Sequence, residues 1–173
     1  MSTPSSPLPV AVLGVGSLGS ALARALLAAG HPTAVWNRTP ARTEPLVGAG
    51  AAAAPSPREV IRAAEVVVVA VADEAAVRAV LEPVASALTG RVVVALTSGT
   101  PEQARDLAAW VERHGARHLD GAAMSGVRLV GDPEALFLYA GRADAFAAAE
   151  PALRALGGAT YLGPDPGVAS LYD

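Results

Sequence analysis

Two kinds of apolar segment alternate along the first two thirds of this chain. Short segments rich in valine are continuously apolar, a pattern typical of strands buried on both faces of a parallel sheet. They are PVAVLG (9–14), TAVWN (33–37), EVVVVAVA (65–72) and RVVVALT (91–97). Longer segments rich in alanine and leucine lie between them. This alternation predicts strand–helix–strand units with right-handed crossovers, and therefore a doubly wound, mostly parallel α/β sheet.

Residues typical of helix ends stand at the boundaries of the longer segments. The first predicted helix starts at Ser17 and ends before Gly30, with Pro32 just beyond. Three further helix starts combine a capping residue with proline in the first turn, which predicts N-termini at Thr39–Pro40, Ser56–Pro57 and Thr100–Pro101.

The pattern changes after His118. The segments ALFLYAG (135–141) and ATYLG (159–163) predict further strands of the same sheet, with a helix over 144–156 between them. VASLYD (168–173) predicts the first turns of another helix. We therefore expect a tail rich in serine and proline that is disordered over 1–8, a domain over 9–164, and the truncated start of a helix over 165–173.

Composition excludes several classes of function. A net charge of −3 gives no support for a nucleic-acid or membrane surface. No apolar run approaches the ~18 residues of a membrane span. The chain has no cysteine, so it has no disulfide and no thiolate metal ligand, and its three histidines lack metal-ligand spacing. We expect no metal site, and the lack of cysteine slightly favours a cytoplasmic location.

The candidate chemistry begins where the first predicted strand ends. Gly14, Gly16 and Gly19 form the pattern GxGxxG, which follows a strand and opens a helix as in dinucleotide-binding domains of the Rossmann type. Gly14 permits a tight turn, Gly16 lets the backbone approach a pyrophosphate, and Gly19 lets the helix pack closely. The helix N-terminus offers free N–H groups to the phosphates.

The end of the second predicted strand indicates which dinucleotide is bound. An acidic residue that would hold the ribose of NAD is expected there, but Asn37, Arg38 and Thr39 occupy these positions. Arginine pairs with phosphate through two parallel hydrogen bonds, and threonine can donate a hydroxyl. These residues favour NADP over NAD. The alternative is that Arg38 is a solvated surface residue and Thr39 only a helix cap.

Two further strand ends lie on the same expected edge. The first delivers Val71, Ala72 and Asp73, and we expect Asp73 mainly to cap the helix over 74–81. The second delivers Thr97, Ser98, Gly99 and Thr100. Ser98 could reach a nicotinamide or a substrate, although a plain turn serine is an equal alternative. The scattered arginines are expected to be solvated: Arg24, Arg58, Arg62, Arg78 and Arg105.

Four segments together resemble the imine reductases, NADPH-dependent relatives of the β-hydroxyacid dehydrogenases. They are VAVLGVGSLGSALARALLAAGHPTAVWNRT, VVVVAVAD, LTSGTP and GGATYLGPDPGVASLYD. The resemblance runs from Pro9 to Asp173 and is most specific at NRT and LGPDPGVASLYD. It implies hydride transfer from NADPH to the carbon of a C=N bond in a small imine or iminium substrate.

The resemblance also implies roles for individual residues. Ser98, on the nicotinamide side, and Asp173, which would orient or protonate the substrate nitrogen, are the implied catalytic residues. The implied cofactor-binding residues are Gly14, Val15, Gly16, Ser17, Leu18, Gly19, Asn37, Arg38, Thr39, Val71, Ala72, Asp73, Thr97, Ser98 and Gly99.

The chain departs from the related dehydrogenases in two ways. They use a lysine on the helix that follows the domain as general acid–base, and this chain has no lysine. The segment DGAAMSGVRLVG (120–131) does not fit their substrate-binding pattern in register. Both departures favour an imine reductase, since an electrophilic iminium needs less acid catalysis. A β-hydroxyacid dehydrogenase and a non-catalytic NADP-binding module stay open as alternatives.

Members of the resembled family continue through the long interdomain helix into an all-helical domain that exchanges with a partner, so that the active site forms between two subunits of a homodimer. We expect residues 1–173 to correspond to the cofactor-binding half alone. We expect it to bind NADPH but to reduce imines poorly, and a monomer is one option for it.

Overall fold

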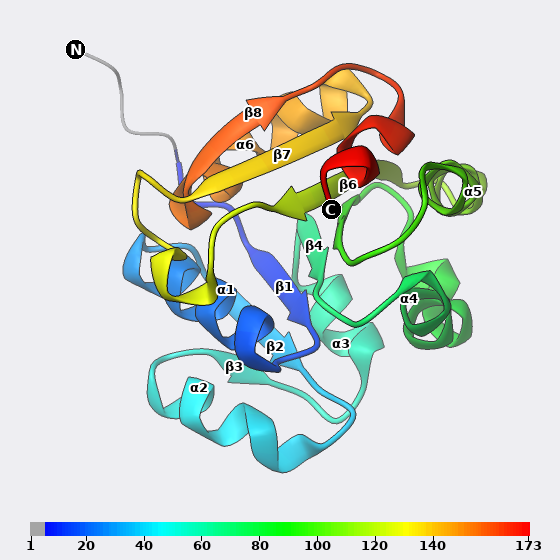
Figure 1. The fold of residues 1–173 in the computed structure, drawn as a ribbon. Helices are drawn as coiled ribbons and strands as arrows, with labels where there is room; N and C mark the ends of the chain where they lie inside the picture. The colour runs from blue at the N-terminus through cyan, green and yellow to red at the C-terminus, as the bar shows by residue number, and fades with distance from the viewer. Residues whose placement is uncertain (1–5) are drawn as a thin grey trace.

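The computed structural model describes residues 6–173, which form an eight-stranded sheet with helices on both faces (Figure 1). The strands are β1 (Val10–Leu13), β2 (Thr33–Trp36), β3 (Ala52–Ala53), β4 (Val66–Val69), β5 (Val92–Leu96), β6 (Arg117–Ala123), β7 (Leu136–Gly141) and β8 (Gly158–Tyr161). The α-helices are α1 (Ser17–Ala28), α2 (Glu44–Gly48), α3 (Pro57–Arg62), α4 (Glu74–Leu81), α5 (Pro101–Arg113) and α6 (Ala143–Leu156). Short 3-10 helices are η1 (Pro40–Thr43), η2 (Glu82–Ala87), η3 (Val127–Leu129) and η4 (Pro166–Tyr172).

The order of the strands confirms the predicted architecture. The sheet runs β3-β2-β1-β4-β5-β6-β7-β8, and only β6 and β7 pair in antiparallel fashion. The strand order reverses between the parallel strands β1 and β4, because the chain adds β2 and β3 on one side of β1 and then crosses over to place β4 on the other side. This is the doubly wound, mostly parallel α/β sheet that the alternating segments predict.

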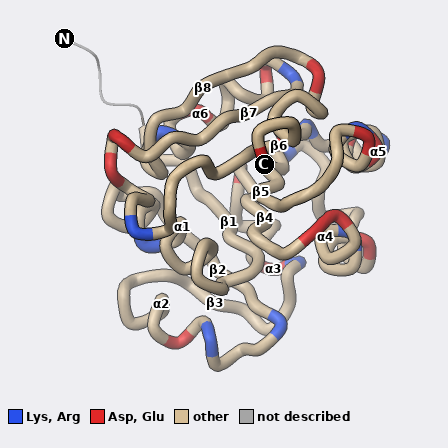
Figure 2. Tube along the Cα trace, in the orientation of Figure 1, with Lys and Arg blue, Asp and Glu red and all other residues tan. Residues whose placement is uncertain are grey.

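The continuous apolar strands have a direct structural reason. Val66 and Val68 of β4 face a core shared with α1 and α6, whereas Val67 and Val69 face a second core shared with α3, α4 and α5. All four side chains are almost completely buried. Both faces of the central strands are therefore covered, and no position on them alternates to solvent. Strands β1, β4 and β5 contain no charged residue, and most charged residues lie on helices and loops (Figure 2).

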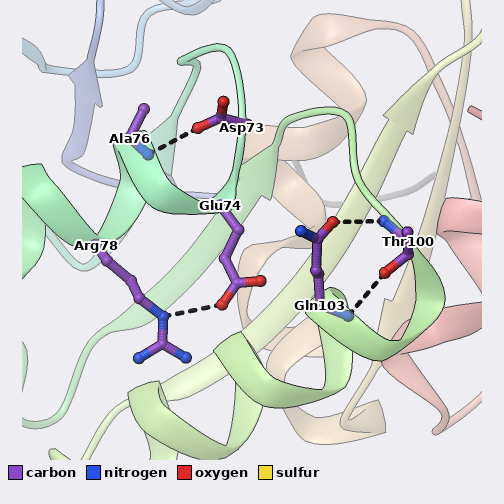
Figure 3. A network of polar contacts seen from close by, with 6 residues as sticks. All are labelled: Asp73, Glu74, Ala76, Arg78, Thr100 and Gln103. Carbon is purple, nitrogen blue, oxygen red and sulfur yellow. Dashed lines mark hydrogen bonds and ion pairs between the residues drawn. The ribbon is translucent and has the colours of Figure 1, made fainter.

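Most predicted helix caps are confirmed. The Asp73 carboxylate accepts a hydrogen bond from the Ala76 amide at 2.8 Å, at the start of α4 (Figure 3). Thr100 and Gln103 form a reciprocal capping box at the start of α5. The Ser56 hydroxyl likewise caps α3. A helix does start at Thr39–Pro40, but it is the 3-10 helix η1, and the Thr39 side chain makes no capping hydrogen bond.

Two elements differ from the sequence-based expectation. The β6 strand was not predicted, because its sequence RHLDGAA mixes polar and apolar residues and carries no strand pattern. It forms a strand because it pairs with β5 on one side and with β7 on the other. The segment VASLY (168–172) lies in the 3-10 helix η4, so the helix expected there has the tighter 3-10 form. Tight turns of this kind are common at helix ends.

The predicted tail over 1–8 falls mainly on residues 1–5, which lie outside the described part. Its last residue, Leu8, packs against the core beside α1, and its amide donates to Nδ1 of His31 at 2.9 Å. Leu8 therefore belongs to the domain.

Three of the five arginines expected to be solvated also have partners among the described residues, although Arg105 is exposed as predicted. Arg105 of α5 makes two hydrogen bonds of 2.9 Å to the Asp165 carboxylate, 60 residues away in sequence. Arg78 pairs with Glu74 and lies 5.5 Å from the centre of the Trp110 ring. Arg58 donates to the Ser86 hydroxyl at 2.9 Å.

No helix within residues 6–173 combines the length and the apolar character that crossing a membrane requires.

The two glycines that flank the first turn of α1 should respond differently to substitution by alanine. A Cβ at Gly19 would collide with the Gly14 carbonyl oxygen, whereas a Cβ at Gly16 would meet nothing within 4 Å. We expect Gly19→Ala to lower the free energy of unfolding by about 2 kcal/mol or more, and Gly16→Ala to change it by less than about 0.5 kcal/mol. Urea denaturation measures both, and equal effects would contradict this account of the loop.

Candidate functional site

The carboxyl ends of five strands meet at one edge of the sheet. The ladder registers place Leu13 beside both Trp36 and Val69, and Leu96 of β5 beside Gly121 of β6. The loops that follow these strands therefore lie next to one another. In open α/β sheets, a crevice at this edge, where the strand order reverses, is the usual place for a ligand.

The glycine-rich loop is held by two hydrogen bonds that its amides donate to the end of β2. The Gly14 amide donates to the Trp36 carbonyl, and the Val15 amide donates to Oδ1 of Asn37 at 3.0 Å. Gly14 has a φ of +91°, and a Cβ there would collide with the Ala70 carbonyl oxygen. Only glycine fits this left-handed, crowded position.

The N-terminus of α1 is open to the crevice. Its cap residue is Gly16, which offers no side chain to the first-turn amides, and the first turn contains no acidic residue. The unsatisfied N–H groups and the helix dipole make this end a site for an anion. The space in front of Gly16 is empty of protein atoms within 4 Å of a would-be Cβ, so a ligand could approach the backbone closely.

Asn37 and Arg38, which follow β2, have different roles in the structure. Asn37 holds the glycine-rich loop through Oδ1 and donates from Nδ2 to the Thr39 carbonyl at 3.1 Å. Arg38 is exposed and makes neither an ion pair nor a hydrogen bond with any residue of 6–173. The guanidinium of Arg38 is therefore available to a ligand, as is the exposed Thr39.

A groove of about 710 Å³ runs beside Arg38, and its size is typical of a site for a cofactor. One side comes from the end of β2 and the other from α3, α4 and the loops around them. Its lining residues are Gly14, Trp36, Asn37, Arg38, Pro55, Ser56, Pro57, Val71, Ala76, Ala79, Val80, Pro83 and Val84.

A second cavity, of about 280 Å³, lies at the ends of β4, β5 and β6. Val71 lines both the groove and this cavity, so the two adjoin at the loop after β4. The second cavity is lined by Leu18, Val71, Ala72, Leu96, Thr97, Ser98, Gly121, Ala123 and Asp173.

The structure brings most of the predicted site residues together. Gly14, Asn37 and Arg38 line the groove, whereas Leu18, Ala72, Thr97, Ser98 and Asp173 line the second cavity. Ser98 and Asp173, the two residues with predicted catalytic roles, thus share one cavity, and their roles stay a prediction. Five predicted cofactor residues line neither space: Val15, Gly16, Ser17, Gly19 and Thr39.

Two predicted residues lie elsewhere. Asp73 points its carboxylate at the first turn of α4, as a helix cap (Figure 3). Gly99 lines a small third cavity, of about 10 Å³, together with Thr97 and Ser98.

Sequence reasoning missed Asp120, which lines that small cavity. The Ser170 hydroxyl of η4 donates to its carboxylate at 2.7 Å. Burial is the main cause that raises the pKa of Asp120 to about 7, the Ser170 hydrogen bond opposes this rise, and the charge of Asp173 adds to it. A signal was present in the segment RHLDGAA, where an acid stands among apolar and small residues in the middle of a buried strand.

His118 is a buried neighbour of Asp120 on the same face of β6. Neither of its ring nitrogens has a hydrogen-bond partner within the described residues, and burial lowers its pKa to about 3. The imidazole is therefore neutral at physiological pH. No group of three or more metal-ligating side chains occurs among the residues that the structure describes.

The fold and the crevice define a dinucleotide-binding domain. Residues 9–163 match the model of the family described as the NAD binding domain of 6-phosphogluconate dehydrogenase, and the chain belongs to this family.

Known relatives agree with the resemblance to imine reductases. An NADPH-dependent reductive aminase of Aspergillus oryzae is 39% identical over 165 residues, covering 95% of this chain and 56% of the relative. The structure of an imine reductase from Bacillus cereus BAG3X2 superimposes with a TM-score of 0.91 at 38% identity, over 94% of this chain and 57% of that one. An imine reductase from Myxococcus stipitatus in complex with NADP+ gives a TM-score of 0.90 at 39% identity, over 94% and 57%.

The chain therefore spans somewhat more than half the length of these relatives. The predicted resemblance to the N-terminal part of the imine reductases is confirmed, and so is the Rossmann-type fold.

Asp120 should make stability depend on pH in a direction unusual for a carboxylate. Between about pH 4 and pH 7 the folded chain binds a proton at Asp120 that the unfolded chain does not, so its contribution falls as pH rises. This loss is at most about 4 kcal/mol. His118 contributes in the opposite sense between about pH 3 and pH 6.5. We therefore expect Asp120→Asn to gain stability relative to the wild type as pH rises from 4 to 8.

Urea denaturation at several pH values measures that difference. Asp106→Asn, at an exposed position of α5, is the matched control and should follow the wild type. Parallel curves for Asp120→Asn and the wild type would show that Asp120 titrates normally.

Proposed function

We propose that this chain is the NADP(H)-binding domain of an oxidoreductase that transfers hydride from NADPH to a C=N bond, as imine reductases do. The observation that carries the proposal is that the exposed Arg38 and Gly14 of the glycine-rich loop line one groove, and that this loop leads directly into the uncapped N-terminus of α1. A free guanidinium and free backbone amides would suit a dinucleotide with an additional phosphate on its ribose.

The residues of the crevice divide naturally among the parts of this cofactor. The backbone at Gly16–Leu18 would hold the pyrophosphate, and Arg38 with Thr39 would hold the 2′-phosphate. The apolar groove walls near Trp36 and Val80 would contact the adenosine. The cavity at the ends of β4 and β5 would receive the nicotinamide ring.

The bound cofactor supplies a hydride, and the chain supplies orientation and charge. Ser98 can donate a hydroxyl hydrogen bond within the second cavity, and Asp173 lines the same cavity with a carboxylate. A carboxylate stabilises a protonated imine electrostatically, and an iminium carbon accepts hydride more readily than a neutral one. We infer that Asp173 holds the substrate nitrogen and its proton, while Ser98 orients the reacting groups.

The remaining wall of the substrate site would come from the part of the relatives' length that lies beyond the residues matched by this chain. Reductive aminases from Aspergillus terreus have been solved with NADPH and carbonyl ligands such as ethyl levulinate. The present chain covers 59% of that protein. We propose that a following helical domain, contributed within a homodimer, completes the site for a small imine. A cytoplasmic location stays a prediction.

A β-hydroxyacid dehydrogenase is the less favoured alternative. A probable 3-hydroxyisobutyrate dehydrogenase-like protein of Arabidopsis thaliana is 32% identical over 156 residues, which is lower than the identity to the reductive aminase. No lysine is present to act as the general acid–base of such enzymes.

Cofactor preference tests the assignment of Arg38. We expect calorimetric titration of the chain to show tighter binding of NADPH than of NADH. Arg38→Asp should weaken NADPH binding at least tenfold, because a charged hydrogen bond is worth about 1.5–3 kcal/mol, and should leave NADH binding nearly unchanged. The matched control is Arg113→Asp at the exposed end of α5, which should alter neither. Equal affinities for NADPH and NADH would remove the 2′-phosphate assignment.

The reaction class is tested by joining residues 1–173 to the C-terminal half of the Aspergillus oryzae reductive aminase. We expect this fusion to oxidise NADPH in the presence of a cyclic imine, and Asp173→Asn to lower the rate at least tenfold because the substrate nitrogen loses its carboxylate. Reduction of NADP+ by a 3-hydroxy acid, with no imine turnover, would instead favour the dehydrogenase.

A further inference from the structure

Asp120 places a carboxylate behind the loop that lines the second cavity. The residue lies in β6 between Ala95 of β5 and Ala140 of β7, and only 4% of it is exposed. Thr97 and Ser98 line both the small cavity that contains Asp120 and the larger cavity that contains Asp173. The carboxylate is thus separated from the larger cavity by a single layer of backbone and short side chains.

The surroundings of Asp120 leave its charge uncompensated. Its hydrogen-bond partner is the neutral hydroxyl of Ser170. The acid Glu74 of α4 lines the same small cavity and is paired with Arg78. Asp173 in the chain after η4 is a second acid.

The other charged and titratable groups near this face do not neutralise Asp120. On β6 itself, His118 is neutral. On α5, Arg105 is bound to Asp165 before η4. No basic side chain of residues 6–173 forms an ion pair with Asp120.

We propose that Asp120 is a specificity-determining residue that favours binding of the oxidised cofactor over the reduced one. This inference rests on the proposed binding of NADP(H). The nicotinamide ring of NADP+ carries a positive charge and that of NADPH carries none, whereas the remaining parts of the two molecules are alike. A buried carboxylate near the ring would attract only the oxidised form, and it acts through a medium of low dielectric constant that screens it weakly.

The preference should grow with pH. Burial raises the pKa of Asp120 to about 7, so the residue is largely protonated at pH 6 and ionised at pH 8.5. Of the two other acids near this face, Glu74 is paired with Arg78 and Asp173 lines the larger cavity. Binding of NADP+ should therefore become tighter as pH rises through neutrality, while binding of NADPH gains no such term.

The experiment compares the dissociation constants of NADPH and NADP+ for the chain 1–173 between pH 6 and pH 8.5. The ratio Kd(NADPH)/Kd(NADP+) cancels the titration of the 2′-phosphate and the contribution of Arg38, because both ligands share them. We expect the wild-type ratio to rise about three- to tenfold over this range. Asp120→Asn, which can still accept from Ser170, should hold the ratio flat at its low-pH value, and Asp106→Asn should behave as the wild type.

A third variant separates charge from support of the fold. Ser170→Ala leaves the charge of Asp120 in place but removes the hydrogen bond that lowers its pKa. The ratio should still rise, with its midpoint at higher pH. If Ser170→Ala and Asp120→Asn behaved alike at pH 8.5, a structural role for the pair would replace this inference.

A flat wild-type ratio would overturn the inference without any variant, so the test does not depend on the folding of Asp120→Asn. A flat ratio with normal NADPH binding would leave the proposed function intact. Failure to bind either cofactor would overturn the proposed function, and this inference with it.

Discussion

The close contact between the Gly14 carbonyl and the Cα of Gly19 is the constraint on which the site depends. It brings the first turn of α1 against the end of β1, so that the helix axis points at the sheet edge. Ala70, after β4, closes on the same turn from the other side. Because no side chain separates these backbones, the open amides of α1 lie at the reversal of strand order, where they can face an anion.

The two ends of the crevice have opposite chemistry. At the β2 end, an exposed arginine borders a largely apolar groove. At the β5 and β6 end, the exposed Asp173 lines the second cavity, and the buried Asp120 lines the small third cavity, which shares Thr97 and Ser98 with it. The phosphate of a dinucleotide would be attracted to the arginine end. Its nicotinamide ring, which becomes positively charged on oxidation, would be attracted to the carboxylate end. Such a polarity would favour one orientation of the cofactor in the crevice.

Local features were predictable from the sequence, and long-range ones were not. The valine runs, the spacing of the three glycines and the caps at Ser56, Asp73 and Thr100 are set by residues within a few positions of one another. The bond from Ser170 to Asp120 joins residues 50 apart, and it forms only after η4 packs against β6. The strand RHLDGAA owes its conformation to partners on both sides, so its own composition gave no strand signal.

The two hydrogen bonds of the Asn37 side chain affect how a domain of this kind could change its cofactor during evolution. An aspartate at this position could still accept from the Val15 amide, but its second oxygen would face the Thr39 carbonyl, which now accepts from Nδ2. Exchange at Asn37 is therefore coupled to the integrity of the loop. The exposed Arg38 side chain makes no hydrogen bond that supports the loop. A change of preference between NAD and NADP could therefore occur by substitution of Arg38. Asn37 would be kept because the fold needs it, and not because the ligand does.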